Sequence, residues 1–198
     1  MNVVSKRSNI WSKVYPIMNL IYILSKTMTT NYAKRKIEKL RFKTGWIYIA
    51  LRYVLLKRLG TNFIGTGYRI IQPNVCIYHA DKLTIGERVT INDNSYLECS
   101  GEIEIGSDVM IGHGVSILSN SHSFENINIP MNEQGETFGK ISIDNNVWIG
   151  AKCTILKGVT IGEGAIVGAH SLVNKDVKPF EIVGGTPIHH IRFRGDKL

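Results

Sequence analysis

Aliphatic residues recur every six positions from Ile85 to Lys178. Each step opens with Ile, Leu or Val, often followed by glycine, and its fifth position holds a residue no larger than valine. A period of six does not give the 3.6-residue stripe of an α-helix, but it suits a short strand followed by a turn. The twelve openings are Ile85, Ile91, Leu97, Ile105, Ile111, Ile117, Ile143, Ile149, Ile155, Ile161, Val167 and Val173.

This period predicts a β-solenoid. Three strand-and-turn steps close a triangular coil of about 18 residues, and stacked coils form parallel sheets about 4.8 Å apart around an aliphatic column. Glycine fits where a sharp bend leaves no room for a Cβ, as in IGER, IGSD, IGHG, IGAK and IGEG. We therefore predict a mainly β fold, a parallel β-helix of hexapeptide repeats. The repeat by itself is equally consistent with a solenoid that has no active site.

The period is interrupted in three places. Two-residue slips occur between Leu97 and Ile105 and between Leu83 and Ile85, and we expect both to bulge at corners of the coil. The third interruption is longer, because the repeat is lost between Ile117 and Ile143 and the intervening residues are polar. We predict that residues 119–140 leave the solenoid as a protruding loop. Long excursions from a compact repeat often carry function.

Charge divides the 198-residue chain into unequal parts. Residues 1–60 contain 13 Lys/Arg and a single acidic residue, Glu38, whereas the remainder is mildly acidic. We predict a basic helical extension at 1–60, a β-helix at 61–183 and a C-terminal tail at 184–198. A chain of this length supports one substantial core. The positive charge is confined to the extension and no nucleic-acid-binding motif occurs, so nucleic acid is not an expected partner.

Residues 9–59 alternate apolar clusters with basic runs, which predicts helices. The apolar clusters are too short and too interrupted for a transmembrane span, and no signal-peptide pattern is present. Two arrangements are open. The helices either cap the open end of the solenoid, or lie on an anionic inner membrane leaflet as a peripheral contact.

The three cysteines, Cys76, Cys99 and Cys153, lie far apart and lack the spacing of a zinc site. We expect them to be small buried residues in a cytoplasmic protein, and we expect no metal.

His122 opens the polar excursion and is the candidate catalytic residue. An imidazole with an ordinary pKa near 6.5 is well matched to taking a proton from an alcohol at neutral pH. Glu125, three residues later, is a candidate for orienting this imidazole through a hydrogen bond.

The stretch VWIGAKCTILKGVTIGEGAIVGAHSLVNKDV, residues 147–177, resembles the hexapeptide-repeat acyltransferases. It is most similar to the sugar O-acetyltransferase branch that modifies capsular or O-antigen polysaccharides and their precursors. The resemblance covers roughly residues 60–195. It implies a left-handed coil, acetyl-coenzyme A as the acetyl donor, and a homotrimer with each site between neighbouring subunits.

The resemblance also implies roles for particular residues. SNSHSF matches the turn that carries the family's catalytic histidine, which makes His122 the general base. Asn92 corresponds to an asparagine that holds the acceptor hydroxyl, and a backbone N–H near Ala151 would meet the oxyanion. The implied coenzyme A contacts comprise an aromatic residue beside the thioester arm, a slot of small residues and a basic phosphate end: Trp148, Ala151, Ala169, Lys175, Arg192 and Arg194.

The expected function is transfer of an acetyl group from acetyl-coenzyme A to a sugar hydroxyl by direct attack, without a covalent enzyme intermediate. Two alternatives remain. The acceptor is instead serine, an amino sugar or an antibiotic, or the chain is a noncatalytic β-helix scaffold.

Overall fold

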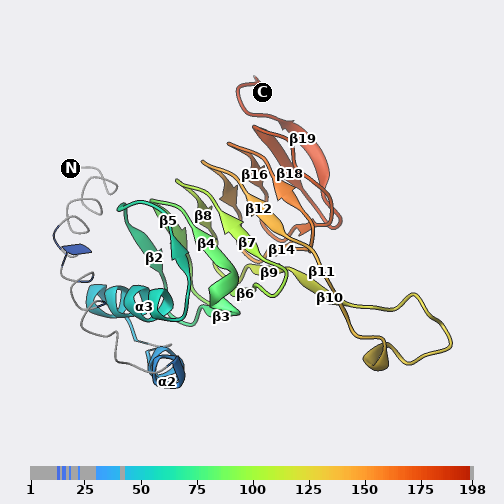
Figure 1. Ribbon diagram of the computed structural model, residues 1–198. Coiled ribbons are helices and arrows are strands. Elements are labelled where there is room, and N and C mark those ends of the chain that lie inside the picture. The colour runs from blue at the N-terminus through green and yellow to red at the C-terminus, as the bar shows by residue number, and fades with distance from the viewer. Residues whose placement is uncertain are drawn as a thin grey trace.

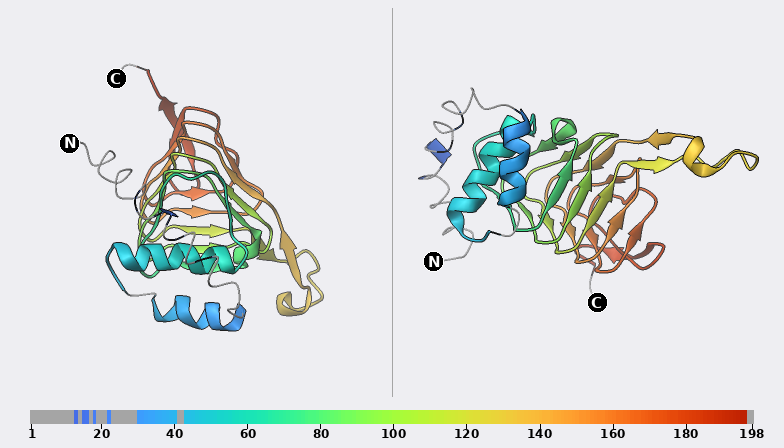
Figure 2. Two further views of the ribbon diagram at one scale, coloured as in Figure 1. Left: turned by 60° about the vertical axis from the view of Figure 1, so that its left-hand side comes forward. Right: turned by 90° about the horizontal axis from the view of Figure 1, so that it is seen from below.

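The protein, represented by a computed structural model, is described at residues 30–40 and 43–196 and at the single positions 13, 15, 16, 18 and 22. Short strands wind through about six turns of a parallel β-solenoid. The solenoid is a prism that has a triangular cross-section in the left-hand view of Figure 2, and its coils stack from the N-terminal to the C-terminal end in Figure 1. The mainly β, parallel β-helical fold predicted from the period of six is confirmed.

Three sheets form the faces of the prism, which we call faces A, B and C. Face A contains β1 (Asn62–Phe63), β4 (Leu83–Ile85), β7 (Ile103–Ile105), β12 (Ile141–Ile143) and β15 (Thr160–Ile161). Face B contains β2 (Arg69–Ile71), β5 (Val89–Ile91), β8 (Met110–Ile111), β13 (Trp148–Ile149), β16 (Ile166–Val167), β18 (Glu181–Gly184) and β19 (His189–Phe193). Face C contains β3 (Cys76–Tyr78), β6 (Tyr96–Glu98), β9 (Ser116–Leu118), β14 (Thr154–Ile155) and β17 (Leu172–Val173).

Turns connect the faces along three edges of the prism. Edge AB leads from face A to face B, edge BC leads from face B to face C, and edge CA returns the chain to face A one coil further on. The strands within the faces pair in parallel, except that β19 runs antiparallel to β18. Residues on one edge are therefore far apart in sequence but adjacent in successive coils.

The aliphatic openings of the repeat form the core. All twelve are at most 2% exposed and belong to one continuous cluster. Burying such a side chain contributes roughly 1.5–3 kcal/mol relative to leaving it in water. The column of Ile, Val and Leu therefore supplies the main driving force for the prism.

One predicted slip is confirmed in its position and the other is wrong. Face B pairs Ile91 with Ile111, twenty positions on, whereas later it pairs Ile149 with Val167, eighteen positions on. In the coil that contains Leu97, the extra residues lie in the turn 99–102 on edge CA.

The slip predicted between Leu83 and Ile85 does not exist as a bulge, because both residues lie in strand β4 and both are buried. Side chains two positions apart in a strand point to the same side, so both can face the core. The extra residues of this coil lie just before β4, where Ala80–Lys82 form the short 3-10 helix η2.

The polar excursion is a hairpin rather than an irregular loop. Strands β10 (Asn120–His122) and β11 (Glu136–Phe138) pair antiparallel, and the 3-10 helix η3 (Met131–Glu133) lies between them. The hairpin leaves edge CA and extends away from the prism (Figure 1). The prism closes beneath it, since Ile105 pairs with Ile143 across the insertion.

Among the residues that the structure describes, two helices with assigned bounds precede the first coil. Helix α2 (Thr30–Lys39) packs on α3 (Trp46–Arg58), and α3 lies across the N-terminal end of the prism (Figure 2). Leu56 of α3 joins the aliphatic core, and the Tyr53 ring stacks on Phe63 of the first coil at a centroid distance of 4.5 Å. Of the helical segment predicted at 9–59, most of the part before Thr30 lies outside the described residues. No helix in the described ranges is both long enough and apolar enough to span a bilayer.

Gly150→Ala should destabilise the prism. A Cβ at Gly150 would lie 2.5 Å from the backbone nitrogen of Ala169 in the next coil, whereas at Gly168 the nearest atom, the carbonyl oxygen of Val183, is 3.3 Å away. We expect Gly150→Ala to lower the free energy of unfolding by about 1–3 kcal/mol in chemical denaturation, and the matched variant Gly168→Ala to cost less. Equal losses in the two variants would contradict this account of coil stacking.

The cysteines should differ in reactivity. Burial raises the pKa of Cys99 to about 12 and also raises the pKa of Cys153, so neither thiol supplies thiolate at neutral pH, while Cys76 is only half-buried. With an aromatic disulfide reagent we expect one thiol to react quickly in the folded protein and three in denaturant. The fast thiol should disappear in Cys76→Ser, and its persistence there would show that a buried thiol is accessible.

Candidate functional site

His122 ends the first strand of the hairpin on edge CA. The backbone of the hairpin is held by cross-strand pairing of Ser121 with Thr137 and of His122 with Glu136, and by a hydrogen bond from the Gly139 N–H to the Ser119 carbonyl at 2.9 Å. The ordered strands fix the position of the His122 backbone at the base of the excursion, close to the prism.

The imidazole of His122 is exposed and makes no hydrogen bond or ion pair with any residue of the described ranges. Glu125 is also exposed, and no hydrogen bond joins it to His122. The acidic residue directly opposite His122 in the strand register is Glu136. Both ring nitrogens are thus available to another molecule, and an orienting role for Glu125 stays a prediction.

Edge BC brings together three of the other predicted residues. Ala151 and Ala169 follow strands β13 and β16 at equivalent positions near this edge, and His113 holds the same position one coil earlier. Asn92 follows strand β5 one position sooner, in register with Gly150. The side chain of Asn92 is half-buried, and its Nδ2 donates to the Ile111 carbonyl at 3.0 Å. Its Oδ1 accepts no hydrogen bond from the described part of the chain.

Asn94, two residues later, is engaged differently. Its Oδ1 accepts a hydrogen bond from Asn74, and its Nδ2 donates to Asp93 at 2.8 Å. Asn94 also has positive φ, as is common for asparagine in a tight turn. Asn94 therefore supports the corner, whereas Asn92 keeps an acceptor oxygen available.

At the corner position of edge BC that holds Ala151, the backbone N–H lacks an acceptor of the kind that the matching corner position of edge AB has. On edge AB, the Glu87 N–H donates to Ser107 Oγ at 3.0 Å and the Ser107 N–H donates to Asn145 Oδ1 at 2.7 Å in the next coil. On edge BC, the corresponding partner of Ala151 is Ala169, whose side chain has no acceptor. The Ala151 N–H donates no hydrogen bond within the described residues. It is available to a developing negative charge or to a ligand carbonyl.

Trp148 lies on the outer surface of face B, beside edge BC. Its neighbour Ile149 points into the core, so Trp148 points outward, and it is 50% exposed. In the strand register it lies between Met110 and Ile166, which gives face B an apolar outer row next to the available N–H groups.

The predicted phosphate-binding residues do not converge within one chain. Lys175 is exposed in the turn after β17 on edge CA, whereas Arg194 follows β19 at edge AB and donates to the Gly164 carbonyl at 2.8 Å. Arg192 donates to the carbonyls of Phe193 and Asp196 at 3.3 and 3.1 Å. The two arginines are thus held by backbone oxygens, and Lys175 is separated from them by a face of the prism.

The predicted residues therefore fall into two main groups. One group, on edge BC and the adjacent outer row, contains Asn92, Trp148, Ala151 and Ala169. The other, on edge CA, contains His122, Glu125 and Lys175. Face C separates the two groups within a single chain.

Two histidine–carboxylate pairs were missed by the sequence analysis. His79 Nδ1 lies 2.8 Å from Glu98 Oε1, and His190 Nδ1 lies 2.8 Å from Glu181 Oε1. Burial opposes ionisation of Glu181, but hydrogen bonds from the Lys178 N–H and the His190 ring outweigh it and lower the pKa of Glu181. His79 and Glu98 are 19 residues apart, which is about one coil, so the repeat pattern could have predicted that they lie side by side in successive coils.

No group of three or more His, Cys, Asp or Glu side chains suited to a metal ion occurs among the residues that the structure describes.

Comparison with known proteins supplies independent information. Residues 140–175 match the family model described as bacterial transferase hexapeptide, six repeats. Galactoside O-acetyltransferase of Escherichia coli K12 is 31% identical over 128 residues, which is 64% of this chain and 62% of that protein. A chloramphenicol acetyltransferase of Agrobacterium fabrum is 34% identical over 117 residues, 59% of this chain and 54% of that protein. The chain thus spans less than two thirds of the length of these curated relatives.

A solved structure extends the likeness over most of the chain. A hexapeptide-repeat-containing acetyltransferase from Vibrio cholerae O1 biovar eltor, complexed with acetyl-coenzyme A, superposes with a TM-score of 0.73 at 31% sequence identity. The match covers 83% of this chain and 86% of that one. The stacked six-residue steps agree with these likenesses, and the chain belongs to the hexapeptide-repeat transferase family.

Proposed function

We propose that the protein transfers an acetyl group from acetyl-coenzyme A to a hydroxyl of a sugar, in a capsular or O-antigen polysaccharide or its precursor. The observation that carries the proposal is a free imidazole at the base of a hairpin, on a prism whose structural neighbour was solved with acetyl-coenzyme A. The sugar acceptor is supported by the similarity to galactoside O-acetyltransferase.

His122 acts as the general base. It removes the proton of the acceptor hydroxyl as the oxygen forms its bond to the thioester carbonyl carbon, and collapse of the tetrahedral intermediate releases the thiolate of coenzyme A. The proton held by the imidazole then passes to that thiolate. The exposure of His122 and its freedom from other hydrogen bonds support this role, because both ring nitrogens are available.

The backbone N–H of Ala151 stabilises the oxyanion. It is a fixed dipole with no acceptor in the described part of the chain, and such preorganised donors are effective because they need no rearrangement during the reaction. Asn92 holds the acceptor hydroxyl through its free Oδ1.

Each site forms between two chains of a homotrimer. Face C separates edge BC from edge CA within one chain, so the base and the oxyanion donor can meet only if edge CA of one subunit approaches edge BC of its neighbour. The hairpin supports this contact, since it exposes several apolar side chains, of which Ile127 is 93% exposed: Phe124, Ile127, Ile129, Met131 and Phe138. Burial of these side chains against a neighbouring subunit would favour association.

Acetyl-coenzyme A lies along edge BC. Ala151 and Ala169 leave a narrow strip of small residues for the pantetheine arm, and the exposed ring of Trp148 packs beside the thioester end. Lys175, Arg192 and Arg194 supply positive charge at the C-terminal end of the prism for the phosphates. Because Lys175 lies on edge CA and the two arginines lie in or just after β19, they too would act from two subunits.

A second acceptor class is supported by the likeness to a chloramphenicol acetyltransferase. The same base and donor arrangement would acetylate an antibiotic hydroxyl, and only the pocket for the acceptor would differ. A panel containing galactosides, an amino sugar, serine and chloramphenicol separates these acceptors by the release of free thiol from acetyl-coenzyme A. Turnover with none of them, together with no binding of coenzyme A, would favour the noncatalytic scaffold.

His122→Ala should abolish most of the turnover while leaving the cofactor site intact. Loss of a general base lowers kcat by about 10²–10⁴. We expect binding of coenzyme A, measured by calorimetry, to change by less than about twofold because the imidazole is not placed among the coenzyme A contacts. His79→Ala is the matched control, since His79 is a paired histidine in the first coil. Unchanged turnover in His122→Ala would remove the proposed mechanism.

Ala169→Thr should reduce turnover by giving the Ala151 N–H an acceptor. Thr and Val have the same size, but only the hydroxyl of Thr can accept a hydrogen bond, as Ser107 does on edge AB. We expect kcat of Ala169→Thr to fall about 10²-fold below that of Ala169→Val, at the lower end of the range for loss of an oxyanion donor. Equal kcat values would show that the Ala151 N–H is not used in the transition state.

A further inference from the structure

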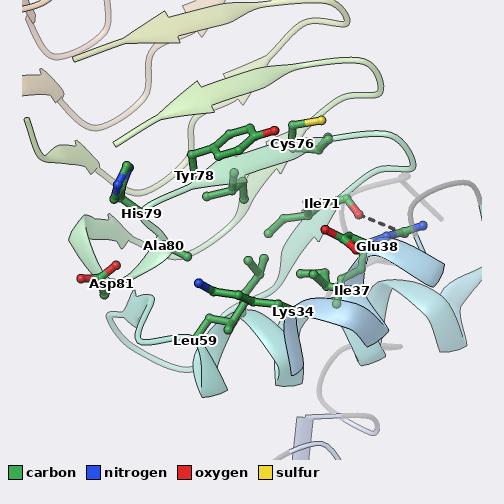
Figure 3. Close-up of a pocket in the computed structure, with 14 residues that line it drawn as sticks. Lys34, Ile37, Glu38, Leu59, Ile71, Cys76, Tyr78, His79, Ala80 and Asp81 are labelled. Atoms are coloured by element: carbon green, nitrogen blue, oxygen red, sulfur yellow. Dashed lines mark hydrogen bonds between the residues drawn. The ribbon is translucent and has the colours of Figure 1, made fainter. Parts of the chain in front are cut away.

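A cavity of about 590 Å³ lies between the helical cap and the first coil of the prism. Helix α2 and helix α3 form one side of it, and the segment from Val75 to Asp81, which includes β3 and the first two residues of η2, forms the other (Figure 3). Its volume is within the range of small-molecule sites. None of its lining residues belongs to the site proposed for acetyl transfer.

The cavity wall is mainly aliphatic. Leu56 of α3 and Ile71 of β2 form part of the buried core, and the cavity lies at the N-terminal end of the aliphatic column, beside helices α2 and α3. The apolar lining residues are Ile37, Leu56, Leu59, Ile71, Val75, Ile77 and Ala80. A ligand with an extended apolar portion would remove both its own apolar surface and the apolar wall of the cavity from water.

The helical side of the cavity is cationic. Lys34 extends from α2 along the opening toward Ala80 and Asp81 (Figure 3), and it forms no ion pair with any described residue. Glu38 is the only acidic residue of α2. The other basic residues of this helix are Arg35, Lys36 and Lys39.

Arg52 of α3 also lines the cavity and is buried. Its guanidinium donates to the carbonyls of Leu40, Lys43 and Ile71, the last at 3.4 Å, but no carboxylate pairs with it in the described ranges. Burial lowers the pKa of Arg52, which is the effect expected for a cation removed from water without a counter-ion. The opposing charges at the cavity are Glu38, which does not bond to Arg52, and the exposed Asp81.

We propose that this cavity binds a single-chain anionic amphiphile, such as a fatty acid or an alkyl phosphate. The alkyl chain lies against the aliphatic wall, and the anionic head pairs with Lys34 at the opening. The ammonium of Lys34, which lines the cavity and forms no ion pair with a described residue, favours an anionic head over a neutral or cationic one. The site is separate from the proposed acetyl transfer, so either can exist without the other.

The proposal can be tested by calorimetric titration of the full chain with dodecyl phosphate below the concentration at which it forms micelles. We expect saturable binding with one molecule per chain, binding of dodecanol weaker by about fivefold or more, and no saturable binding of inorganic phosphate. Vesicles of phosphatidylglycerol distinguish a free amphiphile from a membrane headgroup. Binding to vesicles without binding of monomeric dodecyl phosphate would overturn the cavity site.

Four variants locate the ligand. Lys34→Glu should weaken dodecyl phosphate binding by about fivefold or more, whereas Arg35→Glu, which changes the net charge equally but does not line the cavity, should have less than about a twofold effect. Asp81→Asn should strengthen binding by removing repulsion. Ile37→Trp should abolish it by filling the cavity. Melting curves and circular dichroism establish that each variant is folded.

Equal weakening by Lys34→Glu and Arg35→Glu would mean that the amphiphile responds only to overall charge, and would overturn the proposal. Retained affinity in a folded Ile37→Trp variant would do the same.

Discussion

The stacking of flat coils, one directly on the next, is the constraint on which this structure depends. Backbone hydrogen bonds join each coil to the next. At Gly112 and Gly150 the coils approach so closely that an added Cβ would lie only 2.5–2.6 Å from a backbone atom of the next coil. The inner surface of each coil is filled by the aliphatic column, so every outward position is geometrically fixed by its place in the repeat. Edges and faces therefore present side chains in rows. On edge AB, Ser107 and Asn145 accept hydrogen bonds from backbone N–H groups of the preceding coil. On edge BC the matching residues are alanines, which cannot accept such a bond, so the backbone N–H remains available.

The same constraint explains why the predicted site residues of one chain form two separate groups, one on edge BC and one on edge CA. A triangular prism is rigid and convex, so edges BC and CA cannot fold toward one another. Groups on both edges can cooperate only when a second prism lies alongside. Under the proposed function, catalysis therefore requires assembly of the subunits. The apolar side chains of the hairpin are exposed in the isolated chain because a neighbouring subunit would cover them.

The core and the interruption at His122 were predictable because both follow from local spacing. Ile149 and its equivalents must point inward, and loss of the period after Ile117 marks where the chain departs. The pairing of Thr137 with Ser121 was not predictable, because polar residues give no strand period and the ladder forms through the backbone. The pair His79–Glu98 depends on the length of a coil. The slip at Leu83 was misplaced because two large inward residues, Leu83 and Ile85, lie two positions apart in one strand. The cavity arises from packing between helices and coil, which sequence does not specify locally.

The closure of the prism beneath the hairpin separates the scaffold from its appendage. Strands β7 and β12 pair as though the insertion were absent, and β9 pairs with β14 in the same way. The hairpin can consequently be lengthened, shortened or exchanged without altering how the strands of successive coils pair, since its two ends are already held together. Under the proposed function, a single rigid body can in this way accommodate acceptors of very different size through divergence of one surface segment, leaving the donor side unchanged.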